Sequence, residues 1–180
     1  MSENKRIIVG ISGASGIIYG VTILRTLRTL GFETHLVMSP SAEVTLAHET
    51  DLKVKDVLAL ADHWYKPSNI GAAISSGPFR TKGMIIAPCA IRSMAEIASG
   101  VTSTLLSRAA DVALKERRRL VLMVRETPLH LGHLKTMTTL AEAGAIIAPP
   151  IPAFYSTPES VQDLVDHTVG RVLEMLDLDS

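Results

Sequence analysis

The stretch RIIVGISGASG, residues 6–16, decides the architecture of the chain. Its first six residues are mostly β-branched or aliphatic, which is typical of a strand buried on both faces. After the small residues that end the stretch, apolar side chains recur at helical spacing over residues 17–30, and Gly31 stands where a helix would stop. The next apolar run, Thr34–Met38, completes a βαβ unit.

The same alternation continues to the end of the chain. Short aliphatic runs predict further strands at Met84–Ala87, Leu120–Val124 and Ala145–Ala148. Helical patterns predict helices at Ser41–Glu49, Ala90–Ser99 and Thr104–Arg118, and a last helix capped by Thr157 with Pro158 in its first turn. Residues 66–78 read as irregular. Alternating strands and helices predict an α/β fold with a doubly wound parallel sheet, in one domain spanning residues 1–180.

Composition excludes several classes of function. The 18 Lys and Arg balance 18 Asp and Glu, so there is no basic field to hold nucleic acid or an anionic membrane surface. The single cysteine, Cys89, excludes an internal disulfide and a cysteine-rich zinc site and fits a reducing cytoplasm. No apolar run is long enough to span a membrane, whereas the mean hydropathy of +0.27 is high for a small soluble chain. We therefore expect a soluble cytoplasmic protein that forms a homo-oligomer.

Three turns between a strand and a helix are expected at the carboxyl edge of the sheet, where open α/β folds bind ligands. The first is the glycine-rich loop of residues 10–16, whose backbone N–H groups can approach an anion closely, although a tight turn also needs glycine for steric reasons. Its spacing is neither G-x-G-x-x-G nor a Walker loop, which disfavours NAD and nucleoside triphosphates. Ser39 ends the second strand and suits either a phosphate or a helix N-cap. Arg92, after the third strand, is either an anion contact or a solvated helix residue.

Charged residues form the second set of candidates. Arg125 and Glu126 follow an apolar strand directly and are expected at the same carboxyl edge. Arg108 and Lys115 lie seven residues apart and so share a helix face, while the neighbouring run of residues 116–119 is typical of a solvated helix end. Glu49, Tyr155 and Arg171 are ambiguous when each is judged alone. Cys89 is expected to be a buried thiol, and His130 and His133 lack partners nearby in sequence, so we assign no metal.

Taken together, these segments resemble the UbiX family of flavin prenyltransferases, formerly grouped with phenylacrylic acid decarboxylases. The resemblance covers nearly the whole chain, and its most specific segments are ALKERR, RETPL and PAFY, in that order. It implies a flavodoxin-like or Rossmann-like fold and a homo-oligomer, with trimers assembled into a dodecamer and active sites shared between subunits. It also implies a role in which the product, prenylated FMN, serves a UbiD-type decarboxylase in ubiquinone synthesis or aromatic acid decarboxylation.

The resemblance implies a reaction between reduced FMN and dimethylallyl phosphate. The C1′ carbon of the dimethylallyl group joins flavin N5, flavin C6 then attacks C3′, and inorganic phosphate leaves without help from a metal. The catalytic candidates are Glu49, Lys115, Glu126 and Ser15. The FMN-binding candidates are Gly13, Ala14, Ser15, Ser39, Ala90, Ile91, Arg92, Ser93, Arg108 and Arg125, and the candidates for binding dimethylallyl phosphate are Lys115, Arg125, Glu126, Tyr155 and Arg171.

The chain also departs from the family pattern. Ala90, Arg92 and Ser93 replace a Ser, a Lys and a Thr, Pro40 replaces a Lys, and the chain stops at Ser180 without an Arg-Trp tail. Two alternatives remain: an FMN-binding accessory or carrier protein, and a flavin-dependent cysteine decarboxylase of the same superfold. The second lacks support because its Pro-Ala-Ser-Ala-Asn-Thr and Pro-x-Met-Asn-x-x-Met segments are missing from this sequence.

Overall fold

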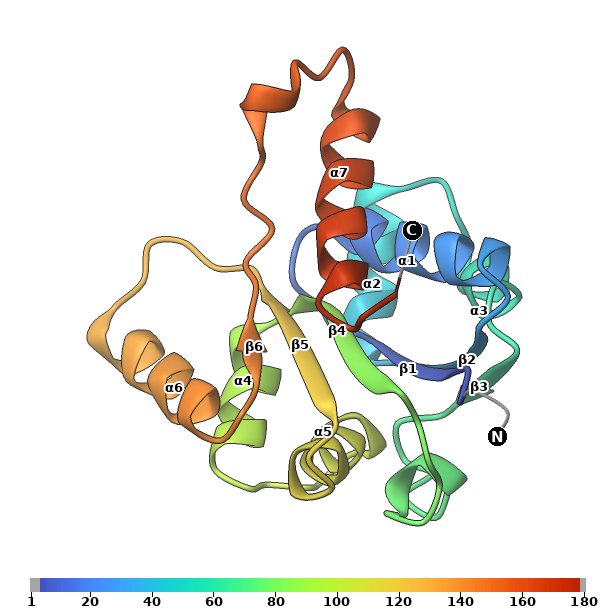
Figure 1. Cartoon of the computed structure of the whole chain (residues 1–180), viewed down its shortest axis with the longest axis vertical. Helices are drawn as coiled ribbons and strands as arrows, with labels where there is room; N and C mark the ends of the chain where they lie inside the picture. Colours follow the sequence, from blue (N-terminus) through green and yellow to red (C-terminus); the bar gives the residue numbers. More distant parts are fainter. Residues whose placement is uncertain (1–3, 179–180) are drawn as a thin grey trace.

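The computed structural model describes residues 4–178, and its strands form one parallel sheet of six strands (Figure 1). The strands are β1 (Arg6–Ile11), β2 (Glu33–Met38), β3 (His63–Tyr65), β4 (Gly83–Cys89), β5 (Arg119–Val124) and β6 (Ile146–Ile147). The α-helices are α1 (Ile17–Thr29), α2 (Pro40–Glu49), α3 (Val54–Leu58), α4 (Ile91–Ala98), α5 (Leu105–Lys115), α6 (Leu131–Glu142) and α7 (Val161–Glu174). Two short 3₁₀ turns, η1 (Ala73–Ser75) and η2 (Phe154–Ser156), complete the elements.

The order of the strands confirms the predicted doubly wound fold. The strands lie side by side as β3-β2-β1-β4-β5-β6, and every pair is parallel. This is the Rossmann order, in which the chain reverses its direction of winding between β1 and β4. The crevice at the carboxyl ends of these two strands is the usual ligand site in such a sheet.

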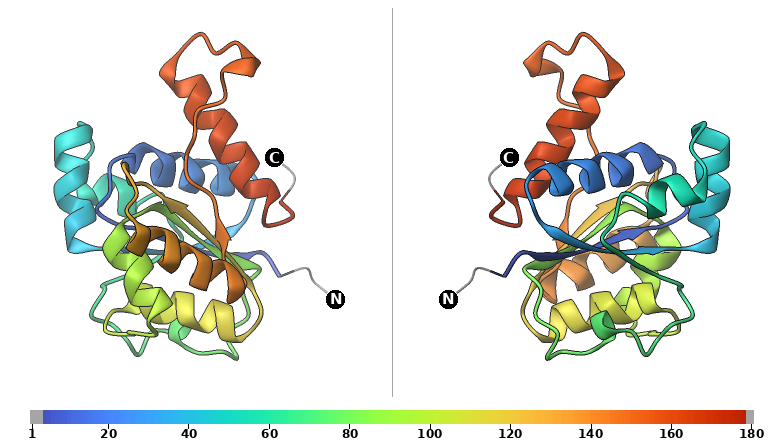
Figure 2. Two further views of the ribbon diagram at one scale, coloured as in Figure 1. Left: turned by 90° about the vertical axis from the view of Figure 1, so that its left-hand side faces the viewer. Right: turned by 90° about the vertical axis from the view of Figure 1, so that its right-hand side faces the viewer.

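Helices cover both faces of the sheet and leave its edges open. Helices α1 and α7 pack on one face, and α4, α5 and α6 pack on the other, as Figure 2 shows in two side views. The strand interiors are buried on both faces, which explains their nearly continuous apolar sequences. The segment that carries η2 and the first turns of α7 projects beyond the sheet (Figures 1 and 2).

The elements that sequence analysis missed or misplaced are the exposed ones. Strand β3 was not predicted because its sequence, HWY, is short and has two exposed residues. Helix α6 was not predicted because Leu140 is its one buried residue. The start of the last helix was wrong: Ser160, not Thr157, caps α7 by accepting the N–H of Asp163, while Thr157 has a φ of 49°. The end of the chain at Ser180 lies outside the described residues.

A buried serine joins the first and third loops of the carboxyl edge. The Ser12 hydroxyl, 1% exposed, donates to the carbonyl oxygen of Pro88 at 2.8 Å and accepts the N–H of Ala90 at 2.7 Å. The N–H of Ser12 donates to the same Pro88 oxygen at 3.2 Å. This one side chain therefore fixes the loop after β1 against the loop after β4, at the point where the winding reverses.

We predict that Ser12→Ala destabilises the protein by about 1–3 kcal/mol, because the substitution leaves the partly buried N–H of Ala90 without its acceptor. Urea unfolding followed by circular dichroism measures the change. The control is Thr138→Ala, which removes an exposed hydroxyl that bonds within α6 and should cost less than about 0.5 kcal/mol. Equal stability of Ser12→Ala and wild type would show that the two loops are held together by other contacts.

Candidate active site

The glycine-rich loop already holds an anion within the chain, and that anion is the carboxylate of Glu49. Glu49 is the last residue of α2, and its Oε2 accepts the N–H of Gly16 at 2.9 Å and the N–H of Ile17 at 3.0 Å. These donors belong to the first turn of α1, where N–H groups lack partners inside the helix. Gly16 caps α1 with a φ of 102°, a left-handed conformation that favours glycine. The loop therefore places Glu49 at the positive end of the α1 dipole.

The surroundings of Glu49 keep it ionised. Burial raises the pKa of this carboxyl, but hydrogen bonds from the Ser15 hydroxyl and from the N–H groups of Gly16 and Ile17 outweigh it, and the charge of Arg125 adds to them. The net result is a pKa below the ordinary value. Tyr19, on α1, also lies within electrostatic reach of Arg125. At neutral pH, Glu49 is thus a proton acceptor held in a fixed position.

A cavity of about 560 Å³ lies at the start of α2, the helix that ends in Glu49. Three helices begin around it: α2 after Ser39, α4 after Ala90 and α5 after Thr104. The N-cap of α4 provides no side-chain acceptor, so the first N–H groups of that helix are available to a ligand. Helix N-termini and hydroxyl groups together form a favourable site for a phosphate group. The cavity is lined by Ser39, Pro40, Ser41, Pro67, Ser68, Ala90, Arg92, Ser93, Glu96, Ser103, Thr104 and Leu106.

Four of the residues predicted to bind FMN line this cavity: Ser39, Ala90, Arg92 and Ser93. Ser39 is also the N-cap of α2 and accepts the N–H of Ala42 at 3.1 Å. This serine therefore caps a helix, as one interpretation of the sequence predicted, and also borders the cavity. Ile91 opens α4 beside them and is partly buried. Gly13 packs so tightly against α2 that an added Cβ would lie 2.5 Å from the side chain of Ser41. Ala14 and Ser15 follow it in the same loop.

Sequence analysis missed four hydroxyl residues of the cavity: Ser41, Ser68, Ser103 and Thr104. Ser41 and Thr104 stand at helix starts, which was a usable signal, whereas Ser68 and Ser103 lie in loops without a pattern. These hydroxyls surround the place where Ala90 replaces the serine of the family pattern. Pro40, which replaces a lysine, takes the first position of α2, where a missing N–H has no cost.

Arg125 and Glu126 emerge at the carboxyl edge, as their position after β5 predicted. The N–H of Arg125 donates to the carbonyl oxygen of Cys89 at 3.1 Å, which fixes the end of β5 beside the end of β4. Both side chains are exposed, and the Glu126 carboxylate accepts the N–H of Thr127 at 3.0 Å. The charge of Arg125 also acts on the carboxyl of Glu49. These two residues and the neighbouring Glu126 therefore form one charged cluster.

The two cations of α5 lie in different places. Arg108, one turn into the helix, donates to the carbonyl oxygen of Ser75 at 3.2 Å and pairs with Asp111 at 2.8 Å. Lys115 is the last residue of α5 and pairs with Glu116 at 2.5 Å. Because a helix rises about 1.5 Å per residue, Lys115 lies about 15 Å along the axis from the end of α5 that borders the cavity. Within one chain, Lys115 is therefore not brought to Glu49.

Tyr155 belongs to the segment that projects beyond the sheet, whereas Arg171 lies in the last turn of α7. Tyr155, in η2, is 82% exposed, and its hydroxyl lies 3.3 Å from Nε2 of His167. Arg171 follows His167 by one turn of α7 and forms an ion pair with Glu174. His167 thus lies between the phenol and the guanidinium along the chain.

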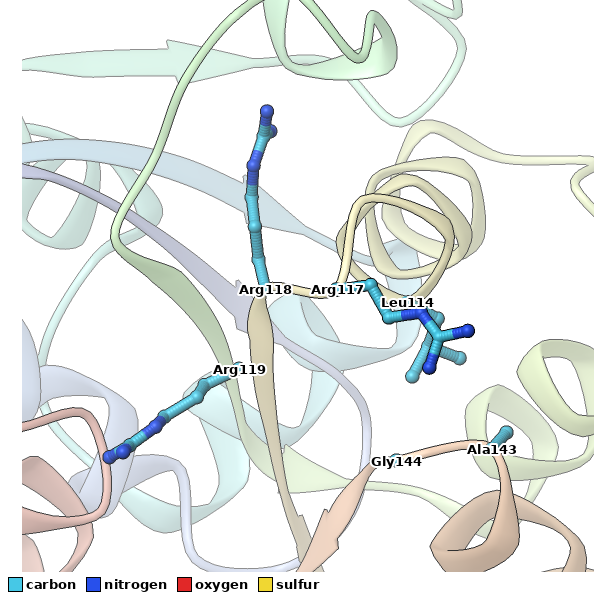
Figure 3. A pocket seen from close by; sticks show the side chains of 6 residues that line it. All are labelled: Leu114, Arg117, Arg118, Arg119, Ala143 and Gly144. Carbon is cyan, nitrogen blue, oxygen red and sulfur yellow. The ribbon is translucent and has the colours of Figure 1, made fainter.

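Residues 116–119 were predicted to be a solvated helix end, but Arg118 and Arg119 make contacts that hold other segments in place. Arg118 donates to the carbonyl oxygens of Phe79 and Gly77 at 2.8 and 2.5 Å, and Arg119 pairs with Asp177 at 2.7 Å. A small hollow of about 180 Å³ lies beside this run and the turn at Ala143 and Gly144. Figure 3 shows Arg118 and Arg119 pointing away from that turn, whereas the side chain of Arg117 extends towards the hollow beside Leu114.

Cys89 and the histidine pair have structural positions, as expected. Cys89 is fully buried, and burial raises the pKa of its thiol to about 12, which excludes a reactive thiolate at neutral pH. His130 caps α6 by accepting the N–H of His133 at 3.3 Å, and the two rings stack with their centroids 3.5 Å apart.

Comparison with known proteins identifies the family of this chain. The flavoprotein family model matches residues 1–173. The chain is 58% identical over 171 residues to the flavin prenyltransferase UbiX of Escherichia coli strain K12, covering 94% of this chain and 90% of that protein. It is 54% identical over 174 residues to UbiX of Thauera aromatica, covering 97% and 90% of the two chains. The chain belongs to the UbiX family of flavoproteins.

Solved structures of members of this family have the same backbone fold as this chain. AnUbiX in complex with FMN and dimethylallyl pyrophosphate superposes with a TM-score of 0.97 at 50% identity, covering 98% of this chain and 94% of that one. A dodecameric FMN-dependent UbiX-like decarboxylase from Escherichia coli O157:H7 gives a TM-score of 0.95 at 48% identity, covering 97% and 96%. The peptidyl-cysteine decarboxylase EpiD, at 15% identity and a TM-score of 0.69, shares the fold alone. Among residues 4–178, no helix is both long and apolar enough to cross a bilayer.

We predict that Glu49→Gln lowers stability at neutral pH by about 0.3–1 kcal/mol, the usual contribution of an exposed charge at a helix N-terminus. The pKa of Glu49 is lower in the folded protein than in the unfolded chain. Its stabilisation is therefore fully present above the unfolded-state pKa and is lost as the pH falls through the folded-state pKa.

Urea unfolding of both proteins across the acidic range measures this difference, with Glu142→Gln as the matched control because Glu142 is also the last residue of its helix. The gap between wild type and Glu49→Gln should close at low pH. A gap that is independent of pH would mean that Glu49 acts through packing and not through its charge.

Proposed function

We propose that this chain is a flavin prenyltransferase that transfers the dimethylallyl group of dimethylallyl phosphate to N5 and C6 of reduced FMN. The observation that carries the proposal is identity above 50% with two flavin prenyltransferases over almost the full length of the chain. The solved relative AnUbiX, with FMN and dimethylallyl pyrophosphate, matches the same backbone.

The residues of the cavity fit the phosphate of FMN. A phosphate monoester needs N–H donors, hydroxyls and a nearby cation, and the starts of α2, α4 and α5 provide these together with Arg92. Arg92 pairs with Glu96 at 3.0 Å on the exposed surface, so its guanidinium is available to turn towards an anion. When bound, reduced FMN supplies the two nucleophilic positions of the reaction.

The roles of the protein groups follow from their charge and position. Departure of the allylic phosphate requires positive charge and a proton, which we assign to Lys115, Arg171 and Arg125 and to Glu126 as the acid. We assign Tyr155 as a hydrogen-bond donor to the same phosphate. Glu49, ionised and held at the glycine-rich loop with Ser15, is assigned to remove a proton as the fourth ring closes.

We further propose that the active site is shared between subunits of a dodecamer. One chain carries the anionic half of the site at its carboxyl edge, whereas Lys115 is at the far end of α5 and Tyr155 projects into solvent with 82% exposure. Large apolar side chains near the projecting segment are exposed as well, among them Ile151 at 72% and Phe154 at 69%. Contact between copies would cover this apolar surface and bring the two sets of residues together.

The finer assignments of place and pathway are part of the same proposal. We infer a cytoplasmic protein that releases prenylated FMN to a UbiD-type decarboxylase, in ubiquinone synthesis or aromatic acid breakdown. The balanced charge and the single buried cysteine support an intracellular setting. The alternative of an FMN carrier without chemistry predicts the same FMN cavity but no change in the flavin.

The decisive assay incubates the protein anaerobically with reduced FMN and dimethylallyl phosphate, and measures the mass of the extracted flavin. We expect a flavin heavier by one C5H8 unit. Glu49→Gln should keep FMN binding but slow the turnover by about 10²–10⁴-fold, the usual contribution of a general base. Glu142→Gln is the control and should turn over normally. An unchanged flavin mass with FMN-saturated wild type would support the carrier instead.

A further inference from the structure

A second cluster of chemically active side chains lies at the amino edge of the sheet, opposite the candidate active site. Glu33, His35 and His63 each offer one ligand atom, and the three atoms all lie within 4.8 Å of one another. Within residues 4–178, this is the one group of three or more potential metal ligands that lie so close together. None of these residues belongs to the flavin site described above.

The sheet itself builds this cluster. Glu33 and His35 are two residues apart on β2, so their side chains point to the same face of the strand. His63 opens the edge strand β3 and is the register partner of His35. Side chains at paired positions of neighbouring strands stand next to each other, so the third ligand joins the first two. Sequence analysis missed the site because its ligands come from two separated segments.

The distances between ligand atoms fit a tetrahedral metal. Oε1 of Glu33 lies 3.1 Å from Nε2 of His35 and 3.4 Å from Nε2 of His63. A tetrahedral Zn²⁺ with bonds of about 2.0–2.1 Å places its ligand atoms about 3.3–3.4 Å apart. The rings of His35 and His63 stack with their centroids 4.7 Å apart and an interplanar angle of 19°, so metal binding would require the His63 ring, whose side chain is 52% exposed, to rotate until both Nε2 atoms face the ion.

Neighbouring residues hold the two inner ligands in place. The Tyr65 hydroxyl lies 2.9 Å from Nδ1 of His35, which leaves Nε2 to face Glu33. Arg6 bonds Oε2 of Glu33 at 3.2 Å and so leaves Oε1 for the imidazoles, while its guanidinium stacks 4.8 Å over the Phe79 ring. An outer hydrogen bond on the second nitrogen of a histidine is the usual support of a metal ligand.

We propose that Glu33, His35 and His63 form a binding site for one divalent transition-metal ion of the zinc type, with water as its fourth ligand. Two imidazoles and a carboxylate are a favourable donor set for Zn²⁺ and a poor one for Mg²⁺ or Ca²⁺, which prefer oxygen ligands. The ion would link β2 to β3, a strand of three residues that pairs with β2 alone. Its role is structural, because it lies at the edge of the sheet away from the flavin site.

Isothermal titration of untagged, EDTA-treated protein with ZnCl₂ tests the proposal. We expect one zinc ion per chain at this site, together with a rise in the midpoint of thermal unfolding, since a ligand that binds the folded state stabilises it. His63→Ala should abolish this binding without unfolding the protein, because His63 is exposed. Tyr65→Phe keeps all three ligands and should weaken the affinity by about tenfold, the effect of losing an outer hydrogen bond.

His133→Ala is the matched control, since His130 and His133 form the other close histidine pair among the described residues. Zinc binding that survives His133→Ala and disappears in His63→Ala supports the site. Absence of zinc binding to wild type, or binding that His63→Ala leaves intact, overturns it. Prenylation in the presence of EDTA should proceed at the same rate, which separates this site from the flavin chemistry.

Discussion

The carboxylate of Glu49 on the N-terminus of α1 is the interaction on which the arrangement of the carboxyl edge depends. It joins the last residue of α2 to the first turn of α1 through the N–H groups of Gly16 and Ile17. Because this carboxylate takes the anion position of the glycine-rich loop, we propose that the phosphate of FMN binds elsewhere. The starts of α2, α4 and α5 supply that other place, in the cavity beside the loop. The same contact therefore separates a proton acceptor from a phosphate site.

The carboxyl and amino edges of the sheet have different roles. At the carboxyl edge, Ser12 holds the ends of β1 and β4 together, and the loops there are free to carry chemistry. At the amino edge, Arg118 donates to the carbonyl oxygen of Phe79. Arg119 donates to the carbonyl oxygen of Met175 and pairs with Asp177, which holds the residues after α7 against the sheet. The zinc site that we propose also lies at this second edge. A rigid sheet between them lets either edge vary without disturbing the other.

The fold was predictable from sequence because the buried strands are continuous apolar runs and α1 has a clear apolar face. Strand β3 and helix α6 were not, since HWY is too short to show a pattern and α6 buries Leu140 alone. Positions at the carboxyl edge were predictable where a residue follows a strand directly, as Ser39 and Arg125 do, or lies in the first turn of the next helix, as Arg92 does. The hydroxyls of Ser68 and Ser103, and the contact between Glu49 and Gly16, depend on distant segments that meet only in the folded chain. For Lys115, the resemblance implies a role in the active site, but within one chain this residue lies at the far end of α5 from the cavity.

We propose that Glu49 of one chain and Lys115 of another act on the same flavin. A complementation experiment mixes Glu49→Gln and Lys115→Ala proteins, each inactive alone, by dissociation and reassembly, with native mass spectrometry to verify hybrid oligomers. Prenylation should return in the hybrids, because some sites then contain an intact Glu49 and an intact Lys115. Hybrid oligomers that form but stay inactive would contradict it.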